Sequence, residues 1–353
     1  MAQKSSDVVI IGAGMVGLSL AYQIKKRFPD LSVLVIEKES KIGLHSSGRN
    51  SGVLHAGIYY PPNTLKAKVC VEGAKRLRQW CESEKLPILK CGKVIVAQSL
   101  DLDSQLDVLL ERGIANGAEV RLISEKEFKQ RVPDGRTASG RALWSPNTCV
   151  VKPALVLQRL FDRLKEKGVK FQFSTIIAEV SANKNLINIT NKSTKEKLYY
   201  GHLFNTAGLQ ADRVAKEFGL SEGFTLLPFK GIYWKLDKNA PFSFNTNLYP
   251  VPDLNVPFLG VHVTPSPDGT ISLGPTAIPA LGRENYQGFE AIEPLMALGF
   301  CGDLLNQWIK NSGGFRKYAR EQALHGFKPL FLKAAKLLVP KMEMKHLVPS
   351  DKV

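Results

Sequence analysis

The hydrophobic pattern is most regular at the start of the chain. Asp7–Ile11 is a short apolar run, and Gly12-Ala13-Gly14-Met15-Val16-Gly17 follows it directly. Met15–Phe28 is apolar at helical spacing, and Leu31–Ile36 is a second apolar run rich in β-branched residues. Strand, glycine turn, helix and strand in this order predict a βαβ unit.

Further along the chain, three segments carry helical signals. Thr64–Lys85 is predicted to be a helix because its apolar residues recur on one face, and Ser124–Glu127 has the spacing of a capping box. Pro153–Lys167 begins with proline and is followed by Gly168, which is the usual asymmetry of helix ends. The apolar residues on the face of the first of these helices are Leu65, Val69, Leu77 and Trp80.

Between and after these helices the pattern favours strands. Short strand-like runs alternate with polar turns from Val169 to Phe204, and the pattern becomes helical again after about Ala291. Longer strands are predicted at Phe229–Leu236, Phe258–Val263 and Thr270–Leu273. The mixture predicts an α/β fold, in which a Rossmann-like nucleotide-binding domain is interleaved with a domain of antiparallel sheet and helices.

The division that we expect assigns residues 1–85 and 145–220, with the C-terminal end, to a cofactor-binding domain. Residues 86–144 and 221–325 form the substrate domain in this prediction. The length of 353 residues is sufficient for two such domains.

The N-terminal glycines form a GxGxxG motif in the context that this motif requires, between a strand and a helix. Gly12 permits the tight turn, Gly14 lets the backbone approach a pyrophosphate, and Gly17 allows the helix to pack on the strand. The helix N-terminus then offers its partial positive charge to the phosphates. Glu37 stands twenty residues after Gly17 and can accept hydrogen bonds from ribose hydroxyls, which disfavours NADP. The motif therefore predicts a dinucleotide site.

A second segment rich in glycine and small polar residues lies close behind, from His45 to Tyr60. It supplies backbone N–H groups and hydroxyls at close range. An extended cofactor that carries a flavin needs such a second cradle, whereas a nicotinamide does not. This segment favours FAD over NAD.

The same segment resembles a known family, the FAD-dependent D-amino-acid-oxidase-like oxidoreductases, and within it most closely the L-2-hydroxyglutarate oxidases and dehydrogenases. The residues that carry the resemblance run from Ser47 to Pro61 and continue at Leu65-Lys66-Ala67. Further stretches agree with the same family, and they are Asn205–Asp212, Pro228–Gly231 with Tyr233, Tyr249–Pro252, Phe258–His262 and Gly274-Pro275.

The resemblance implies FAD-dependent oxidation of L-2-hydroxyglutarate to 2-oxoglutarate, by transfer of a hydride to the flavin. The site must supply a base and clamps for a small dicarboxylate 2-hydroxy acid. Histidine suits the base because its pKa lies near neutral pH. We expect His55 to be the base and His262 to orient the substrate. The residues expected to bind the substrate are Arg49, Tyr60, Lys230, Tyr249 and Arg283, with arginine favoured for bidentate binding.

The cofactor residues that we expect come from three parts of the chain. They are Gly12, Gly14, Met15, Gly17, Glu37 and Lys38 in the βαβ unit, Ser47, Gly48, Asn50, Ser51 and Gly52 in the second cradle, and Ala207 and Gly208 later. Family members continue past the length of this chain with a segment that closes over the flavin, so we expect one wall of the cofactor site to come from residues beyond Val353.

Two alternatives remain open at this stage. One is an amine or amino-acid oxidase of the same fold, because removal of a hydride next to nitrogen uses the same flavin geometry. The other is a flavoprotein remnant that lacks part of its cofactor site and does no chemistry.

The charge of the chain allows several partners. The net charge is +16, but Lys and Arg are spread along the sequence without a basic-aromatic module, so nucleic-acid binding is not expected. A site for anionic substrates, contact with an anionic membrane surface, and a solvated basic surface all remain possible. The basic region Arg316–Val353, with Phe331, Leu332, Leu337 and Leu338, is one candidate for peripheral membrane contact, where electrons would pass to quinone rather than to oxygen.

Cysteine usage and the N-terminus bear on the compartment. The five cysteines show no CxxC spacing, so neither a metal site nor a disulfide is expected. The polar N-terminus leaves no room for a signal peptide before the first strand, and no apolar run reaches about 18 residues. We therefore expect a cytoplasmic protein.

Overall fold

The described part of the chain has a mixed α/β fold, as predicted. A computed structural model describes residues 4–191, 194–220, 222–252, 260–311, 314–316, 319, 327–350 and 352. The chain divides into two compact units, each built from segments that are far apart in sequence. Unit 1 comprises residues 1–50 and 153–228, and unit 2 comprises residues 51–152 and 229–353. Residues 51–85 thus lie in unit 2, and their assignment to the cofactor domain stays a prediction.

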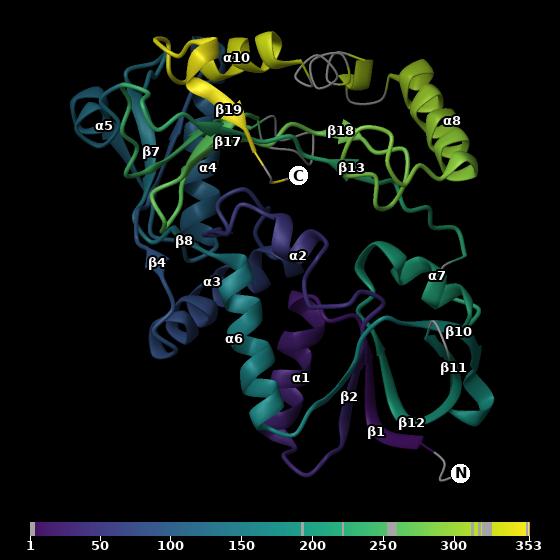
Figure 1. The fold of residues 1–353 in the computed structure, drawn as a ribbon. Helices are drawn as coiled ribbons and strands as arrows, with labels where there is room; N and C mark the ends of the chain where they lie inside the picture. Colours follow the sequence, from purple (N-terminus) through teal and green to yellow (C-terminus); the bar gives the residue numbers. More distant parts are fainter. Residues whose placement is uncertain are drawn as a thin grey trace. The chain divides into compact units, whose positions relative to one another are not determined.

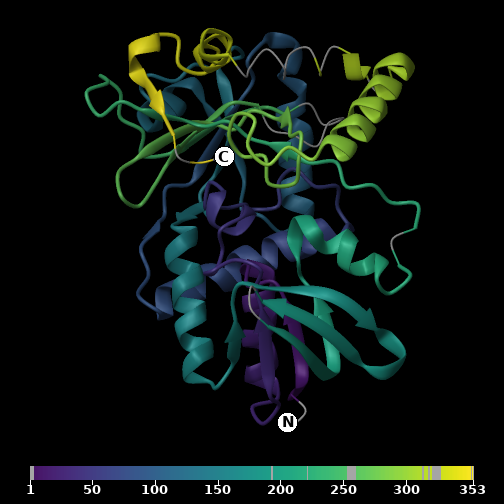
Figure 2. The same ribbon diagram turned by 45° about the vertical axis from the view of Figure 1, so that its right-hand side comes forward.

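Unit 1 is built on a six-stranded sheet with the N-terminal strand at its centre (Figures 1 and 2). β1 is parallel to both of its neighbours, β2 and β12, and β2 is parallel to β9, whereas β10, β11 and β12 form an antiparallel meander. The strands, in sheet order, are β10 (Thr175–Ser181), β11 (Leu186–Asn191), β12 (Lys195–Asn205), β1 (Lys4–Ile11), β2 (Val33–Ile36) and β9 (Lys170–Gln172).

The predicted βαβ unit is confirmed. Helix α1 (Met15–Arg27) connects β1 to β2 and packs against α6 (Pro153–Glu166), beside the parallel strands in Figure 1. All four residues of β2 are buried, as expected for a strand inside a parallel sheet. Two short helices complete the unit, α2 (Ser46–Arg49) and α7 (Ala211–Lys216), together with short 3-10 turns.

Unit 2 contains an eight-stranded, mostly antiparallel sheet. β15 is parallel to β5, and the other pairs of strands described in this sheet are antiparallel. Its strands, in sheet order, are β19 (Leu347–Pro349), β14 (Trp234–Leu236), β17 (Ile271–Gly274), β16 (His262–Pro265), β15 (Asn247–Pro250), β5 (Lys93–Val96), β7 (Arg141–Ser145) and β6 (Arg121–Ser124). Two small sheets accompany it, one of β3 (Val53–Leu54), β8 (Cys149–Val151) and β4 (Ile88–Leu89), the other of β13 (Phe229–Lys230) and β18 (Ile278–Pro279).

Two helices of unit 2 begin where the sequence predicts. Thr64 caps the first one by accepting a hydrogen bond from the Ala67 N–H, and Ser124 caps another by accepting from the Glu127 N–H, which confirms both helix starts. The helices of the unit are α3 (Leu65–Ser83), α4 (Ser104–Ala115), α5 (Glu125–Arg131), α8 (Pro294–Lys310) and α10 (Lys328–Lys336).

The single strand predicted at Phe229–Leu236 is wrong. The segment forms β13 and β14, which belong to different sheets. The break includes Gly231, where a Cβ atom would lie 2.5 Å from Pro275, so only glycine fits this close approach. The strand predicted at Thr270–Leu273 is confirmed as β17. Of the expected Phe258–Val263 strand, residues 258 and 259 lie outside the described residues, and His262 and Val263 belong to β16.

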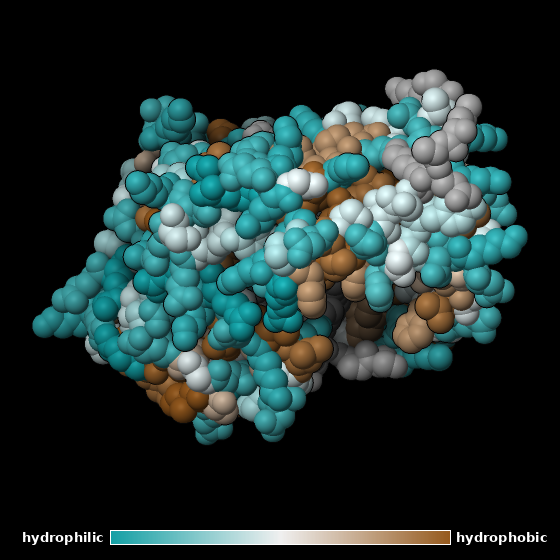
Figure 3. Space-filling model, turned by 90° about the horizontal axis from the view of Figure 1, so that it is seen from below, coloured by the Kyte–Doolittle hydropathy of each residue, from teal (hydrophilic) through white to brown (hydrophobic). Residues whose placement is uncertain are grey.

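The apolar side of α10 belongs to the core of unit 2. Phe331 and Leu338 are buried there with residues of the large sheet, while Leu337 is exposed. The segment expected to present a membrane-facing surface therefore uses much of that surface for its own packing. Within the part of the chain that the structure describes, no helix is both long and apolar enough to cross a bilayer. The face drawn in Figure 3 is largely hydrophilic, with apolar side chains in separate patches.

Candidate active site

The glycine turn of unit 1 is held at the end of β1 by close backbone contacts. Gly12 has a φ of +101°, and a Cβ atom on it would lie 2.5 Å from the carbonyl oxygen of Thr206. A Cβ atom on Gly17 would lie 2.0 Å from the carbonyl oxygen of Gly12. Only glycine fits at either position. The glycines therefore place no side chain of their own beside the N-terminal end of α1, which lets the phosphates of a dinucleotide approach the backbone there.

Ser47 and Glu37 fix this turn from two sides. The Met15 N–H donates to Ser47 Oγ at 2.9 Å, and the Ala13 N–H donates to Glu37 Oε2 at 2.7 Å. A Cβ atom on Gly14 would lie 2.9 Å from Ser47 Oγ, so the second cradle directly adjoins the first. Glu37 is buried and its other oxygen accepts from the Glu39 N–H at 2.9 Å. The structure thus shows Glu37 joining two turns, and ribose binding by it stays a prediction.

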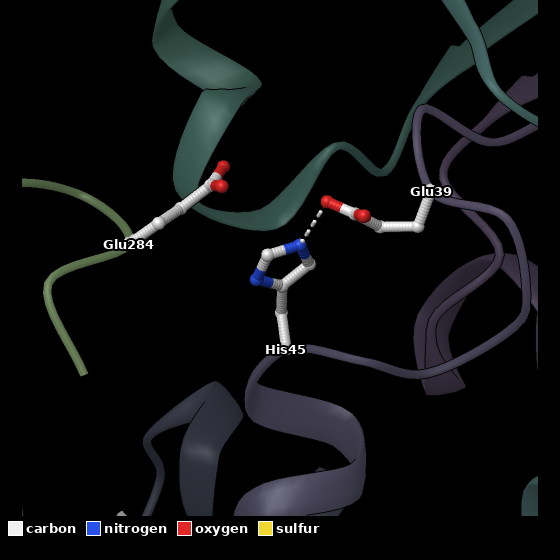
Figure 4. A group of neighbouring side chains, drawn as sticks. All are labelled: Glu39, His45 and Glu284. Carbon is white, nitrogen blue, oxygen red and sulfur yellow. Dashed lines mark hydrogen bonds and ion pairs between the residues drawn. The ribbon is translucent and has the colours of Figure 1, made fainter. Parts of the chain in front are cut away.

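After Glu37 in the chain, a polar pair, Glu39 and His45, connects two parts of the loop that leads to α2. His45 Nε2 lies 2.9 Å from Glu39 Oε1, as Figure 4 shows, and Lys38 pairs with the same carboxylate. The hydrogen bond from Lys38 is the main cause that lowers the pKa of Glu39, and the His45 contact adds to it. Lys38, expected to touch the cofactor, is thus engaged with Glu39.

The short helix α2 carries three further residues singled out by the sequence. A Cβ atom on Gly48 would lie 2.3 Å from the Gly43 carbonyl oxygen. Arg49 Nε donates to the Leu44 carbonyl at 2.8 Å, and the Asn50 amide donates to two carbonyls of the helix at 2.9 and 3.1 Å. All three residues shape this helix, whereas contacts of theirs with cofactor or substrate remain predictions.

The end of β12 meets the glycine turn. Thr206 Oγ1 donates to the Ile11 carbonyl at 2.6 Å and so ties the ends of β1 and β12 together. Gly208 has a φ of +55°, and the Ala207 N–H donates to Asn205 Oδ1 at 3.3 Å. The structure places residues 205–208 beside the glycine turn, while contact of Ala207 and Gly208 with the cofactor stays a prediction. Thr206 was not singled out from the sequence.

In unit 2, the large sheet aligns three polar side chains on one face. Register pairs Lys93 of β5 with Asn247 of β15, so Lys93 and Tyr249, two residues further along, project from the same face. Leu248 pairs with Val263 of β16, which places Tyr249 opposite His262. The loop after β3 adds His55 and Tyr59 to this cluster.

The five side chains are in direct contact. The Tyr249 and His262 rings stack with centroids 3.8 Å apart, and the His55 ring meets Tyr249 edge-on at 6.4 Å. Lys93 Nζ lies 3.3 Å from His55 Nδ1, 4.5 Å from the centroid of the Tyr249 ring and 5.0 Å from that of Tyr59. The cluster brings together two residues expected in the site, His55 and His262, with the expected Tyr249.

Burial governs the protonation of this cluster. It lowers the pKa of Lys93 from 10.5 to about 7, and it lowers the pKa of His55 to about 3, with the positive charge of Lys93 as the second cause. Burial likewise holds the pKa of His262 well below 6.5 and raises the pKa values of Tyr59 and Tyr249. Both imidazoles are therefore neutral at physiological pH.

The two histidines differ in their surroundings. His262 is 3% exposed, and its Nδ1 lies 3.2 Å from Thr264 Oγ1. His55 is half-buried, and its carbonyl accepts a hydrogen bond from Cys70 Sγ at 3.1 Å. His55 is therefore the more accessible of the two, and its loop is anchored on α3.

Other residues expected in the site lie elsewhere in unit 2. Lys230 donates to Asn285 Oδ1 at 2.9 Å, and burial lowers its pKa. Arg283 is buried in the loop that Asn285 organises, two residues away. Tyr60 is half-buried and its pKa is raised by burial. None of the contacts described among these residues joins Lys230 or Arg283 to His55, so their binding of substrate stays a prediction.

Two residues of the second cradle, Ser51 and Gly52, form hydrogen bonds with other residues of unit 2. The Ser51 side chain hydrogen-bonds to Tyr233, whose pKa burial nevertheless raises to about 12. Gly52 has a φ of +77°, and its carbonyl accepts from the Val151 N–H at 2.9 Å. Their expected role in holding the cofactor is not visible in these contacts.

Sequence reasoning missed Lys93. The residue stands at the start of Lys93–Val96, a strand whose four residues are all buried. The signal available in the sequence was one lysine directly followed by an uninterrupted apolar run. Lysine is almost never fully buried unless it is paired, so a lysine in a buried strand indicates a special role.

Comparison with known proteins agrees with this geometry. Residues 7–325 match the family model of FAD dependent oxidoreductases. The mitochondrial L-2-hydroxyglutarate dehydrogenase of Caenorhabditis elegans is 37% identical over 329 residues, which cover 92% of this chain and 73% of that protein. The human protein of the same name is also 37% identical, over 81% of this chain and 64% of its own length. An L-2-hydroxyglutarate dehydrogenase of Escherichia coli is 34% identical, over 84% and 70%.

Solved structures share the fold. The L-alpha-glycerophosphate oxidase of Mycoplasma pneumoniae, solved with FAD bound, has a TM-score of 0.77 at 22% identity and covers 98% of this chain and 82% of its own. Glycine oxidase from Geobacillus kaustophilus has a TM-score of 0.70 at 16% identity, over 99% and 81%. With its glycine turn, its second cradle and a family match over most of its length, this chain belongs to the FAD-dependent oxidoreductases, and FAD is its cofactor.

Proposed function

We propose that the protein oxidises L-2-hydroxyglutarate to 2-oxoglutarate. The substrate class is supported by relatives that carry this activity in their names. The match with this chain covers more than two thirds of the length of each of them. The observation that carries the chemistry is the contact of His55 with a buried, cationic and aromatic cluster in unit 2.

Each residue of the cluster has a place in this reaction. FAD, when bound, accepts the hydride from the carbinol carbon. His55 is proposed to accept the proton of the substrate hydroxyl, because it is neutral and half-buried. His262 stacks against Tyr249 and is proposed to orient the substrate through that ring. Arg49, Tyr60, Lys230 and Arg283 are proposed as anchors for the two carboxylates.

A spectroscopic experiment tests the proposal. The purified chain is loaded with FAD and mixed anaerobically with L-2-hydroxyglutarate, glycine, sarcosine or D-amino acids. We expect the flavin absorbance to bleach with L-2-hydroxyglutarate only. Bleaching by an amine would assign the protein to amino-acid oxidation instead, and protein that takes up no FAD would mark it as a remnant.

The reduced flavin needs an acceptor, which we propose to be oxygen or a quinone. Reoxidation by air or only by added quinone distinguishes the two. A cytoplasmic protein in peripheral contact with an anionic membrane would suit the second, and the net charge of +16 supports such contact. In the described residues, α8 offers a better surface for it than α10, because it exposes Leu295, Leu298, Leu305 and Ile309 on one face.

A further inference from the structure

Lys93 is a buried lysine whose amine nitrogen hydrogen-bonds to His55. Its side chain is 0% exposed, and His55 Nδ1 is the one hydrogen-bond partner of its Nζ among the described residues. The faces of Tyr59 and Tyr249 lie next to the same nitrogen. A lysine that is buried without a carboxylate partner is costly, so its position against an imidazole calls for a functional reason.

The hydrogen bond between the two residues decides which nitrogen of His55 can act as a base. If Lys93 is an ammonium, it donates to Nδ1, and a neutral ring then carries its proton on Nε2. If Lys93 is a neutral amine, it accepts from Nδ1–H, and the Nε2 lone pair is free. Nε2 has no hydrogen-bond partner among the described residues, so it remains available to a substrate.

We propose that Lys93 positions His55 for catalysis, by holding its ring in the tautomer with Nδ1–H and by receiving that proton when Nε2 takes one from the substrate. This inference rests on the proposed function, in which His55 is the base. It adds a residue that acts through His55 and does not touch the substrate.

The protons balance in this scheme. The substrate O–H bond breaks and an N–H bond forms at Nε2, while the Nδ1–H bond breaks and an N–H bond forms at Nζ of Lys93. The pair begins neutral and ends with one positive charge on Lys93, and the carbinol hydride leaves to FAD. No charge needs to rest on the imidazole.

The protonation properties of the pair fit this role. His55 alone is a weak base because its pKa is about 3, whereas Lys93, with a pKa of about 7, can hold a proton at physiological pH. The aromatic faces of Tyr59 and Tyr249 stabilise the ammonium that forms. The titratable groups that surround the pair are Cys70 of α3, Cys91 before β5, Tyr59, Tyr249 of β15 and His262 of β16.

NMR of the whole chain tests the pair without substrate. The tautomer of His55 is followed through its ring nitrogens, assigned with a His55→Gln variant, and the Lys93 ε-carbon is followed over the same pH range. We expect both signals to change together at a midpoint of about pH 7, with Nδ1–H above it and Nε2–H below it. A His55 tautomer that stays constant, or a Lys93 that titrates near its ordinary value of 10.5, overturns the proposal.

Substitutions give a second measurement. Lys93→Arg keeps a permanent donor against Nδ1 and should lock His55 with its proton on Nε2 at every pH, whereas Lys93→Met should abolish the change near pH 7. Lys90→Met removes an exposed lysine that pairs with Glu82 and serves as the control. If the buried variants do not fold, the titration of the unsubstituted chain still decides the question.

Flavin reduction separates this inference from the proposed function. With L-2-hydroxyglutarate, Lys93→Arg should slow reduction roughly 10²-fold or more with little change in KM, and the rise of the rate near pH 7 should disappear. Normal reduction in this variant would refute the role of Lys93 and leave the function intact. If His55 and Lys93 titrate together but L-2-hydroxyglutarate does not reduce the flavin, the proposed function is refuted and the coupling of the two residues still holds.

Discussion

At the scale of single residues, the two units depend on different physical effects. The turn of unit 1 requires residues without a side chain. At Gly12 and Gly17 other backbone atoms lie so close that a Cβ atom would collide with them. The cluster of unit 2 requires burial, because the same side chains in water would titrate at their ordinary pKa values. One substitution in each unit tests these effects.

Replacing Gly12 by alanine should destabilise unit 1 strongly. The new residue meets both a φ of +101° and the carbonyl of Thr206 at 2.5 Å, and each strain costs roughly 1–3 kcal/mol. Gly168→Ala is the matched control, because Gly168 has a φ of +76° with open space around it. Urea denaturation should show the larger loss for Gly12→Ala, together with loss of bound FAD. Equal losses for the two variants would contradict the close approach seen at Gly12.

Replacing His55 by glutamine should remove the base and keep the fold. We expect the rate of flavin reduction to fall by roughly 10²–10⁴-fold, while the FAD content stays unchanged, because the glycine turn predicted to bind the dinucleotide does not include His55. His202→Gln changes an imidazole at an exposed position of β12 and serves as the control, with no change in the rate expected. Unimpaired reduction in His55→Gln would exclude this residue as the base.

At the scale of secondary-structure elements, the two C-terminal helices differ in the fate of their apolar residues. The apolar side of α10 is buried in the core of unit 2, through Phe331 and Ala335. In α8, Phe300 is buried, whereas Leu298 is 72% and Leu305 59% exposed. An exposed apolar face on a basic protein is typical of a surface that binds anionic lipid.

The double substitution Leu298→Glu, Leu305→Glu should weaken binding of the chain to vesicles of anionic lipid. Each change removes an apolar contact with the bilayer and adds a negative charge, so together they should reduce the bound fraction in flotation assays about tenfold or more. Binding to neutral vesicles is the control for charge. If the unsubstituted chain does not float with anionic vesicles, the proposed membrane contact is wrong.

At the scale of the whole molecule, the lowered pKa values of His55 and His262 link stability to pH. Both stay neutral in the folded chain, His55 down to a pKa of about 3, whereas in the unfolded chain they take up protons near 6.5. The unfolded state therefore binds more protons below about pH 6.5, so the free energy of unfolding falls as the pH falls.

We expect a loss of roughly 1.4 kcal/mol per pH unit from each of these histidines between about pH 6.5 and 5. His262→Gln should reduce the slope by about half of this combined contribution, measured as urea midpoints across this range. His202→Gln, a change at an exposed position of β12, should leave the slope unchanged. A midpoint that does not depend on pH in the unsubstituted chain would contradict the burial of both imidazoles.

Much of the fold could be read from local patterns. The βαβ unit, the helix over Thr64–Lys85, the cap at Ser124 and the helix at Pro153 were predicted correctly, because periodicity, caps and prolines act over a few residues. The strand at Phe229–Leu236 was predicted wrongly, since its first part pairs with β18 and its last part with β17 and β19, and these partners lie far along the chain. Of the residues expected in the site, His55, Tyr249 and His262 lie together in the structure, while their roles stay predictions. Lys93, which contacts His55 and Tyr249, was not singled out from the sequence.

The sequence by itself determined the cofactor and the family. A dinucleotide is bound mainly by backbone groups, and the glycines that let it approach the backbone form a motif within one short segment. Only the tertiary structure decided which charged groups meet. Lys93 and His55 are 38 positions apart, and Tyr249 and His262 come from strands later in the chain. Their contacts depend on sheet register, and their shifted pKa values depend on burial among one another, neither of which a local pattern specifies.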